Sequence, residues 1–383
     1  MKKLINKTNI FLFAALLTLL IPSLLFSLNS NSFFAANALG GECMVTIESS
    51  SGRILYGHNY NSKRPMASVT KILTAITVLE NCTDISKPIS IPKQAVGVEG
   101  SSIYLAEGEK ISTLDLLYGL MLQSGNDCAV ALAVSTSGNI KDFSDLMNKT
   151  AQRAGATSSN FTNPHGLHDD DHYTTALDLA LITAYAMNNP IFKQISSTKK
   201  QIITRTRTDA VTTIHNKNKI LSTLDGADGV KTGFTKKAGR TFVGSATRDN
   251  MQIICVVLNC GPMFEDSAAL INKAFKEYSL KKIAGGYQSI AAVPIKNSKE
   301  KQVSAGTIKD VFYPLKAYET IQVVPKIGTE LVAPIKKGYH IGQADFVLNG
   351  KTILSESLYT TADTKALNIK DKLGKLIDQW FND

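Results

Sequence analysis

The order of strand-like and helical stretches is the feature of this sequence that most restricts its fold. Short strand-like runs stand at both ends of its first two thirds: Cys43–Glu48, Arg53–Tyr56, Gly229–Gly233, Phe242–Thr247 and Gln252–Leu258. Stretches with apolar residues at helical spacing lie between them. The outer strands are expected to pair with one another, because each needs a partner for its backbone groups. We therefore predict a mixed α/β fold over residues 39–284, one antiparallel sheet with a helical block.

Local signals place the helices of this region. Ser112 or Thr113 is expected to cap a helix that ends at Gln123–Asn126, where a second helix begins. Two later stretches, Asp178–Met187 and Ala268–Tyr278, also have the helical pattern. Arg248–Asn250 is predicted to be a hairpin turn between two of the strands.

The character of the sequence changes from about Gly285. Helical periodicity ends, and short alternating runs replace it: Ser289–Pro294, Val311–Tyr313, Thr320–Val324, Thr329–Pro334 and Phe346–Leu348. Asn349-Gly350 is a strong hairpin turn signal. Residues 285–363 are therefore predicted to form a small all-β domain.

The last segment, residues 364–383, has the pattern of an amphipathic helix. One face collects Ile369, Leu373, Leu376, Ile377, Trp380 and Phe381, and Lys370, Lys372 and Lys375 lie on or beside the other. Helices that lie in a membrane interface place tryptophan on the apolar face in this way. We predict that this helix binds a membrane surface, the alternative being that it packs on the β-domain.

The amino terminus has the pattern of a signal peptide over residues 1–38. Lys2, Lys3 and Lys7 precede the apolar run Ile10–Leu28, and Ala36-Asn37-Ala38 is a cleavage signal. An uncleaved membrane anchor is the alternative, because the run approaches spanning length. In either case the protein is expected to be exported, to the outer face of the cytoplasmic membrane or the cell wall.

Charge and cysteine usage limit the class of partner. Cleavage after Ala38 removes three lysines and no acidic residue, so the formal net charge falls from +10 to +7. The sequence contains no cluster of basic and aromatic residues of the kind that binds nucleic acid, so a nucleic-acid partner is not expected. The five cysteines have neither the density of a disulfide scaffold nor the spacing of a metal site. A disulfide between Cys255 and Cys260 is the one bridge that the sequence leaves as an alternative.

Three short motifs carry the chemistry of the sequence: Ser68-x-x-Lys71, Ser124-Gly125-Asn126 and Lys231-Thr232-Gly233. Ser68 and Lys71 are one helical turn apart, so their polar ends can meet. A neutral lysine can serve as the base for a serine nucleophile when burial and a cation such as Lys231 depress its pKa. Alone, the pair would more often be a helix cap and a solvated lysine.

The other two motifs supply what this pair lacks. Ser124 can relay a proton to a leaving amine, and Asn126 has a donor and an acceptor with which to orient an amide. Thr232 adds a hydroxyl for a substrate carboxylate, and Gly233 lets the strand approach a ligand. The N–H groups of Ser68 and Phe234 are candidates for an oxyanion hole.

These motifs, in this order, resemble the signature of penicillin-recognising serine enzymes. The residues in and around these motifs are similar to those of the D-alanyl-D-alanine carboxypeptidases, the low-molecular-mass penicillin-binding proteins. The blocks that carry the resemblance are Ala67–Lys71, Leu122–Asp127, Asn163–Leu167 and Gly229–Gly233. A signal peptide, a catalytic domain, a β-domain and a terminal amphipathic helix also follow one another as in that family. The resemblance implies a β-lactamase/transpeptidase-like catalytic domain.

The resemblance also implies roles for the motif residues. Ser68 would be the acylated nucleophile, Lys71 its general base and Ser124 part of the proton relay. Asn126 would orient the substrate, while Lys231 and Thr232 would hold its terminal carboxylate. The implied reaction removes the terminal D-alanine from peptidoglycan pentapeptide stems, needs neither cofactor nor metal, and is inhibited by β-lactams that acylate the serine.

The chain departs from the family at two places. Some members have a histidine after Lys-Thr-Gly where this chain has Phe234, so only a backbone role transfers. Members often carry an arginine that helps to bind the carboxylate in the segment matching Pro262-Met263-Phe264, which contains none.

Several alternatives remain at this point. His165, His168, His172 and Asp169–Asp171 form either a zinc site or, more often for such an irregular stretch, a structural loop or active-site rim. Cys128 is a weaker candidate nucleophile.

A serine β-lactamase usually has Asp at the place of Gly125 and lacks the β-domain. A D,D-endopeptidase would use the same residues, and the non-enzyme alternative is a wall-binding protein that binds penicillin with slow turnover.

Overall fold

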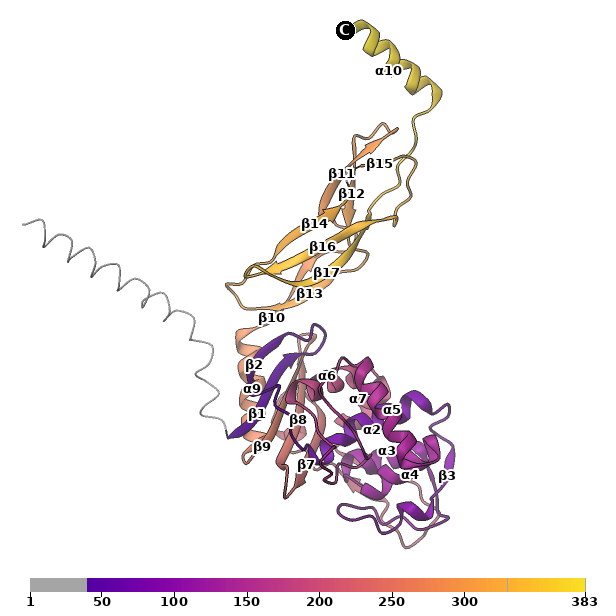
Figure 1. Cartoon of the computed structure of the whole chain (residues 1–383), viewed down its shortest axis with the longest axis vertical. Coiled ribbons are helices and arrows are strands. Elements are labelled where there is room, and N and C mark those ends of the chain that lie inside the picture. Colours follow the sequence, from indigo (N-terminus) through magenta and orange to yellow (C-terminus); the bar gives the residue numbers. More distant parts are fainter. Residues whose placement is uncertain (1–39, 329, 383) are drawn as a thin grey trace, which may run out of the picture.

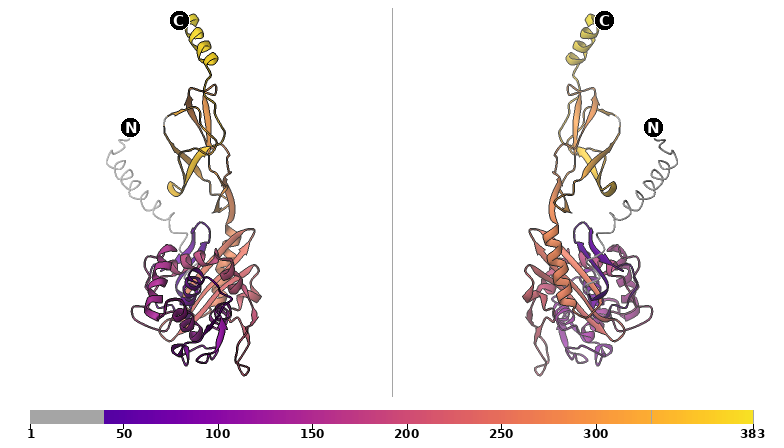
Figure 2. Two further views of the ribbon diagram at one scale, coloured as in Figure 1. Left: turned by 90° about the vertical axis from the view of Figure 1, so that its right-hand side faces the viewer. Right: turned by 90° about the vertical axis from the view of Figure 1, so that its left-hand side faces the viewer.

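The computed structural model describes residues 40–328 and 330–382, so the predicted signal peptide lies outside the described residues. The molecule is elongated (Figure 1). An α/β part, from β1 to α9, occupies one end, a β-rich part follows, and helix α10 stands at the other end. The two further views show the same arrangement (Figure 2).

The α/β part contains a five-stranded antiparallel sheet in the order β2-β1-β9-β8-β7. Its strands are β1 (Gly41–Glu48), β2 (Ile54–His58), β7 (Ala227–Thr235), β8 (Gly239–Arg248) and β9 (Met251–Cys260). Strand β1 therefore pairs with β9 from the far end of the region, as predicted, and β2 forms the edge of the sheet beside β1. Asp249 and Asn250 have φ angles of 47° and 62° in the turn between β8 and β9, which matches the twist of a tight hairpin.

Helices cover both faces of this sheet. They are η2 (Ala67–Thr70), α2 (Lys71–Asn81), η3 (Lys93–Ala95), α3 (Thr113–Leu122), α4 (Asn126–Ser137), α5 (Ile140–Arg153), α6 (Ala176–Met187), α7 (Pro190–Ser197), α8 (Ile220–Thr223) and α9 (Met263–Glu277). Two hairpins, β3 (Pro88–Ser90) with β4 (Lys110–Ser112) and β5 (Lys200–Ile202) with β6 (Thr213–His215), flank the helical block.

Alternation along β1 shows how the sheet divides the core. Val45 and Ile47 pack into the cluster that contains α2 to α7, whereas Met44 packs with Leu270 and Ile271 of α9 on the other face. Adjacent strand residues point to opposite faces, and the last six residues of β1 are all buried because both faces are covered. The predicted mixed α/β fold is confirmed.

The β-rich part begins earlier than the change in sequence pattern near Gly285. Strand β10 (Ser279–Ala284) follows α9 directly and pairs with β13 (Val311–Leu315). A second sheet has the order β14-β16-β17-β12-β11-β15. Its strands are β11 (Ala291–Lys296), β12 (Gln302–Gly306), β14 (Gln322–Ile327), β15 (Leu331–Val332), β16 (His340–Leu348) and β17 (Lys351–Thr360). The all-β character is as predicted, although β12 and β17 were not predicted as strands.

Arg53 joins the two parts. Its guanidinium forms an ion pair with Glu319 and donates a hydrogen bond to the Pro314 carbonyl oxygen. It also lies over the rings of Tyr278 and Tyr313, 5.1 and 5.4 Å from their centroids. Arg53, the residue before β2, therefore places a cation between the end of α9 and the β-rich part.

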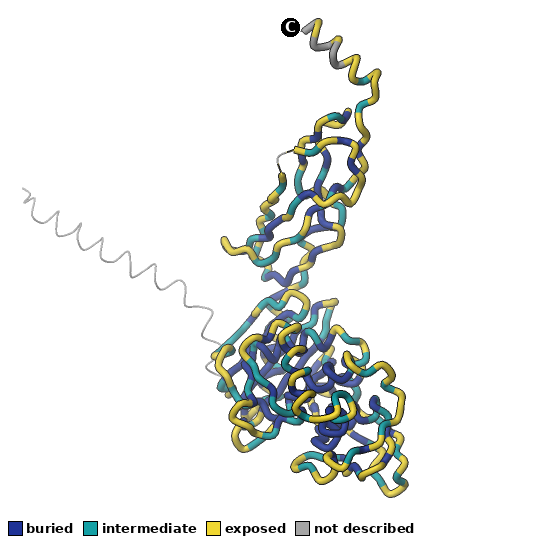
Figure 3. Tube along the Cα trace, turned by 45° about the vertical axis from the view of Figure 1, so that its right-hand side comes forward, coloured by how far each residue is buried: buried dark blue, intermediate teal, exposed yellow. Residues whose placement is uncertain are grey.

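Helix α10 (Ile369–Asn382) forms within the segment predicted to be helical. Its side chains Ile369 and Trp380 have 77% and 86% of their surface exposed. The buried residues are instead concentrated in the α/β part, as the tube in Figure 3 shows. Among the described residues, no helix combines the length and apolar character required to cross a bilayer.

The five cysteines are unpaired, and all except Cys82 are buried. The Cys255–Cys260 bridge that the sequence left open is absent. Both side chains instead pack in the cluster between β9 and α9 as small apolar groups.

Candidate active site

Ser68 and Lys71 lie at the junction of η2 and α2. The first turn is a tight 3₁₀ turn, and the regular helix starts only at Lys71. The Lys71 Nζ lies 3.0 Å from the Ser68 Oγ, 2.7 Å from the Asn126 Oδ1 and 2.7 Å from the His165 carbonyl oxygen. Ser68 is not the cap of this helix, and Lys71 is fully buried rather than solvated.

This set of contacts accommodates an ammonium group, which donates to all three oxygens, and equally a neutral amine. The Asn126 Oδ1 and the His165 carbonyl oxygen can only accept hydrogen bonds, so they take two N–H groups. A neutral amine then has one lone pair left, and its third contact is the Ser68 hydroxyl, which can donate to it. Complete burial lowers the pKa of Lys71 to about 7, and the charge of Lys217 contributes to that lowering while Asp127 opposes it.

The loop Asn163–Leu167 packs against the Ser68 turn and the start of α2. The Pro164 carbonyl oxygen accepts a hydrogen bond from the Thr74 hydroxyl at 2.7 Å, next to the bond from Lys71 to His165. Gly166 has a φ angle of 87°, and a Cβ there would lie 2.0 Å from the Ala67 carbonyl oxygen. Glycine is therefore required at position 166 by the close approach of the loop to the nucleophile turn.

His172, which the sequence placed either in a zinc site or in a structural loop or active-site rim, also supports this turn. The Thr162 N–H donates to its Nδ1 at 3.0 Å, so the Nε2 must carry the proton that is donated to the Thr70 hydroxyl at 2.9 Å. Thr70 in turn donates to the Ala67 carbonyl oxygen. Burial lowers the pKa of His172 to about 4, which keeps the ring neutral. Both ring nitrogens are thus engaged, which supports the loop interpretation over zinc.

The second motif forms the turn between α3 and α4. Ser124 is a left-handed residue with a φ angle of 63°. The Asn126 Nδ2 donates to the Glu99 carbonyl oxygen at 2.5 Å, so the amide spans the distance between Lys71 and the 99–105 loop. Burial raises the pKa of the neighbouring Cys128 thiol well above its usual value, which argues against this residue as a nucleophile.

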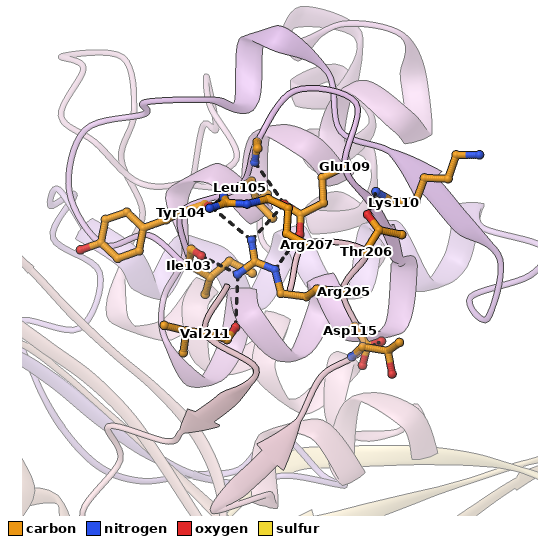
Figure 4. Close-up of polar contacts among 12 residues, drawn as sticks. Ile103, Tyr104, Leu105, Glu109, Lys110, Asp115, Arg205, Thr206, Arg207 and Val211 are labelled. Carbon is orange, nitrogen blue, oxygen red and sulfur yellow. Dashed lines mark hydrogen bonds and ion pairs between the residues drawn. The ribbon is translucent and has the colours of Figure 1, made fainter. Parts of the chain in front are cut away.

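The 99–105 loop is held from both sides by charged residues that sequence reasoning missed. The Asp127 carboxylate accepts hydrogen bonds from the N–H groups of Ile103 and Leu105. The Arg205 guanidinium donates hydrogen bonds to two carbonyl oxygens of the same loop, those of Ile103 at 2.8 Å and Tyr104 at 3.1 Å. Figure 4 shows Arg205 at the centre of this network.

All five donors of Arg205 are used. Besides the loop, they reach the Val211 carbonyl oxygen and both oxygens of Glu109, the latter at 2.7 and 2.9 Å. Both side chains of this ion pair are at most 1% exposed. The pair therefore ties the β5–β6 hairpin to the loop that contacts Asn126.

Replacing Arg205 with methionine is expected to lower the free energy of unfolding by about 3–5 kcal/mol, because Glu109 would remain buried without its partner. Urea unfolding of the purified protein measures this. The control is Arg207→Met, which breaks an exposed ion pair with Asp209 and a hydrogen bond to the Tyr104 carbonyl oxygen. It should lower the free energy of unfolding far less, because exposed ion pairs contribute little. Equal effects of the two changes would contradict the role assigned to the buried pair.

The third motif lies on β7 beside the Ser68 turn. A Cβ at Gly233 would lie 2.9 Å from the Ser68 backbone nitrogen, so only glycine lets the strand pass this close. The Lys231 Nζ donates to the Thr232 carbonyl oxygen at 2.9 Å. Burial, and then the charges of Lys71 and Lys217, hold the pKa of Lys231 well below its usual value. Phe234 is 65% exposed.

A cavity of about 370 Å³ opens where the three motifs meet. Its lining residues are Ser68, Ser101, Ser124, Lys217, Thr232, Gly233, Phe234, Arg240, Met263 and Phe264. Of the residues predicted from the sequence, Lys71, Asn126 and Lys231 are buried and do not line it. Ser101, Lys217 and Arg240 were not predicted, because each reaches the cavity from a segment without a recognisable motif.

Comparison with known proteins identifies the family. The family model of D-alanyl-D-alanine carboxypeptidases matches residues 32–261, more than half of the chain. The chain belongs to this family. It is therefore a serine-type peptidase, a hydrolase, as the motifs predicted. The family model for the C-terminal domain of penicillin-binding protein 5 matches residues 278–366.

Individual members of the carboxypeptidase family resemble most of the chain. The D-alanyl-D-alanine carboxypeptidase DacF of Bacillus subtilis is 29% identical over 346 residues, covering 88% of this chain and 89% of the relative. The carboxypeptidase DacA of Haemophilus influenzae is 30% identical over 347 residues, covering 86% of each. The crystal structure of penicillin-binding protein 5 from H. influenzae has a TM-score of 0.72 at 29% identity and covers 85% of this chain and 98% of that one.

Proposed function

We propose that this protein removes the terminal D-alanine from peptidoglycan pentapeptide stems through an acyl-enzyme on Ser68. The observation that carries the proposal is the contact set of Lys71, a buried amine that faces the Ser68 hydroxyl and two acceptor-only oxygens. The names of the relatives, all D-alanyl-D-alanine carboxypeptidases, give the substrate class.

The first step forms the acyl-enzyme. The Ser68 Oγ attacks the carbonyl carbon of the penultimate D-alanine, and Lys71 takes the hydroxyl proton. The peptide bond breaks, and Ser124 relays this proton from Lys71 to the leaving amine, so that free D-alanine departs and Lys71 is neutral again. The N–H groups of Ser68 and Phe234 stabilise the oxyanion, and Gly233 holds the strand close to the Ser68 turn for this purpose.

The second step restores the enzyme. Water attacks the ester carbonyl, Lys71 accepts a proton from it, and the Ser68 oxygen leaves with a proton to become a hydroxyl again. The products are a tetrapeptide stem with a new carboxylate and the free enzyme. β-Lactams would react by the first step, because opening of their ring leaves the acyl group on Ser68 without a departing amine.

Mass spectrometry of two substrates tests this proposal. A soluble pentapeptide stem and a cross-linked muropeptide dimer are each incubated with the purified protein lacking residues 1–38. We expect loss of one D-alanine from the pentapeptide and an unchanged dimer. Cleavage of the dimer in preference to the pentapeptide would identify a D,D-endopeptidase. If neither substrate gives a product and penicillin labels the protein stably, the protein is a penicillin-binding protein with slow turnover.

We also propose that the protein is exported and held at a membrane surface by α10. In support, Ile369, Leu373, Ile377 and Trp380 are exposed apolar side chains of one helix that lies far from the α/β part (Figure 1). Thr364 should stay in any truncation, because its backbone pairs with Ile335.

Truncation after Leu367 is therefore expected to move the protein from the membrane to the soluble fraction with D-alanine release retained. Fractionation of cells and activity of both fractions measure this. Trp380→Gln in the full chain should give an intermediate distribution, because it removes one interfacial contact. Membrane association of the truncated chain after signal cleavage would contradict the assignment of α10 as the anchor.

A further inference from the structure

We propose that Arg240 binds the terminal carboxylate of the substrate, as a guanidinium supplied to the cavity from strand β8. This assignment rests on the proposed function and adds to it the residue that selects a free carboxylate. No motif includes Arg240, and the sequence left the carboxylate to Lys231 and Thr232.

The register of the sheet places Arg240 at the cavity. Phe234 of β7 is paired with Arg240 of β8, and Thr232 is paired with Phe242. Directly opposed residues of an antiparallel pair share a face, and so do residues two apart on one strand. The side chains of Arg240, Phe234 and Thr232 thus lie on the same face, and all three line the cavity with Ser68.

Arg240 is distinguished by its lack of a carboxylate partner. The chain has seven arginines, and six of them form ion pairs: Arg53, Arg64, Arg153, Arg205, Arg207 and Arg248. No ion pair between described residues includes Arg240, which is exposed. It donates one hydrogen bond, to the Gly261 carbonyl oxygen at 3.3 Å. Among the described residues no carboxylate occupies its remaining donors, so these donors are left for a bidentate contact with a substrate carboxylate.

The other cations of the site are less suited to this task. The Lys217 Nζ is bonded to the Gln123 carbonyl oxygen at 3.0 Å, and the Lys231 Nζ to that of Thr232. Burial lowers the pKa of both lysines. An arginine also presents a planar fork that can bind a carboxylate through two parallel hydrogen bonds, which a lysine cannot form.

Arg240 also reaches the wall of the cavity that Met263 lines. Its bond to Gly261 brings the guanidinium to the start of the segment that contains Met263. Met263 lines the same cavity. A cation thus reaches this wall of the cavity from strand β8.

Arg240→Gln tests the assignment with two matched substrates, an acyl-D-Ala-D-Ala peptide and the same peptide ending in a carboxamide. A charge-assisted bidentate contact predicts a loss in kcat/KM of about 10- to 100-fold for the carboxylate substrate and less than about threefold for the carboxamide. Arg240→Lys should recover part of the loss, since it restores the charge without the fork. The control is Lys237→Gln, which removes an exposed charge three residues away that does not line the cavity.

A second measurement does not depend on turnover of the carboxamide. The rate of Ser68 acylation is compared for benzylpenicillin and its methyl ester, and Arg240→Gln should slow only the reaction of the free acid. Equal losses on charged and neutral ligands, or no loss on either, would overturn the assignment of Arg240. If the unmodified protein releases no D-alanine and is not labelled by penicillin, the proposed function fails instead.

Discussion

Replacing Ser68 with alanine is expected to abolish both covalent labelling by a fluorescent penicillin and release of D-alanine. The Ser68 Oγ is the nucleophile, and it lies 3.0 Å from the Nζ of the buried Lys71. Alanine has no atom to acylate, so neither the ester nor its hydrolysis can occur. Gel fluorescence after denaturation measures the covalent adduct, and mass spectrometry measures the released D-alanine.

The change should leave the fold intact, because it removes one hydroxyl from a half-buried position. The thermal midpoint should therefore stay close to that of the unmodified protein. The matched control is Ser86→Ala on an exposed loop, which should be labelled in full. Full labelling of the Ser68 variant would refute the acyl-enzyme mechanism and direct attention to another nucleophile.

Replacing Lys71 with glutamine is expected to reduce the acylation rate by about 10²–10⁴-fold, the usual contribution of a general base. Glutamine can still donate to the Asn126 Oδ1 or the His165 carbonyl oxygen, but its amide cannot accept the Ser68 proton as an amine does. Stopped-flow or gel measurement of acylation by a β-lactam gives the rate. A rate within threefold of the unmodified protein would remove Lys71 from the role of base.

The pH dependence of acylation provides an independent check on Lys71. Its pKa of about 7 means that the amine is protonated, and inactive as a base, below that pH. The rate should therefore rise with pH through about 7 and level off above it. Lys217→Gln removes a positive charge that lowers this pKa, so it should shift the rising limb to higher pH. A shift to lower pH would show that another group controls the limb.

The parts of the fold that sequence predicted correctly depend on local patterns. The hairpin turn at Asp249 and Asn250 and the cap at Ser112, whose side chain accepts from the Asp115 N–H, are signals within a few residues. Strand β12 and strand β17 were missed because one is short and rich in small residues and the other has mostly half-buried and exposed positions.

The residues that sequence missed at the site act through distant partners. Arg205 and Glu109 are 96 positions apart, and Thr70 and His172 are 102 apart. No periodicity or spacing rule connects residues across such separations, because the fold alone brings them together. Arg240 was missed for a related reason: its place in the cavity depends on the register between β7 and β8. The three motifs were found because their members are close in the chain.

The left-handed backbone at Ser124 has a consequence for which amino acids this position can accept. Its φ angle of 63° lies in a region that a β-branched side chain avoids, because the branch collides with the neighbouring backbone. Threonine would preserve the hydroxyl but not the conformation of the turn. A saturation library at position 124, selected for enzyme that still releases D-alanine, is therefore expected to return serine and to reject threonine in spite of their shared functional group.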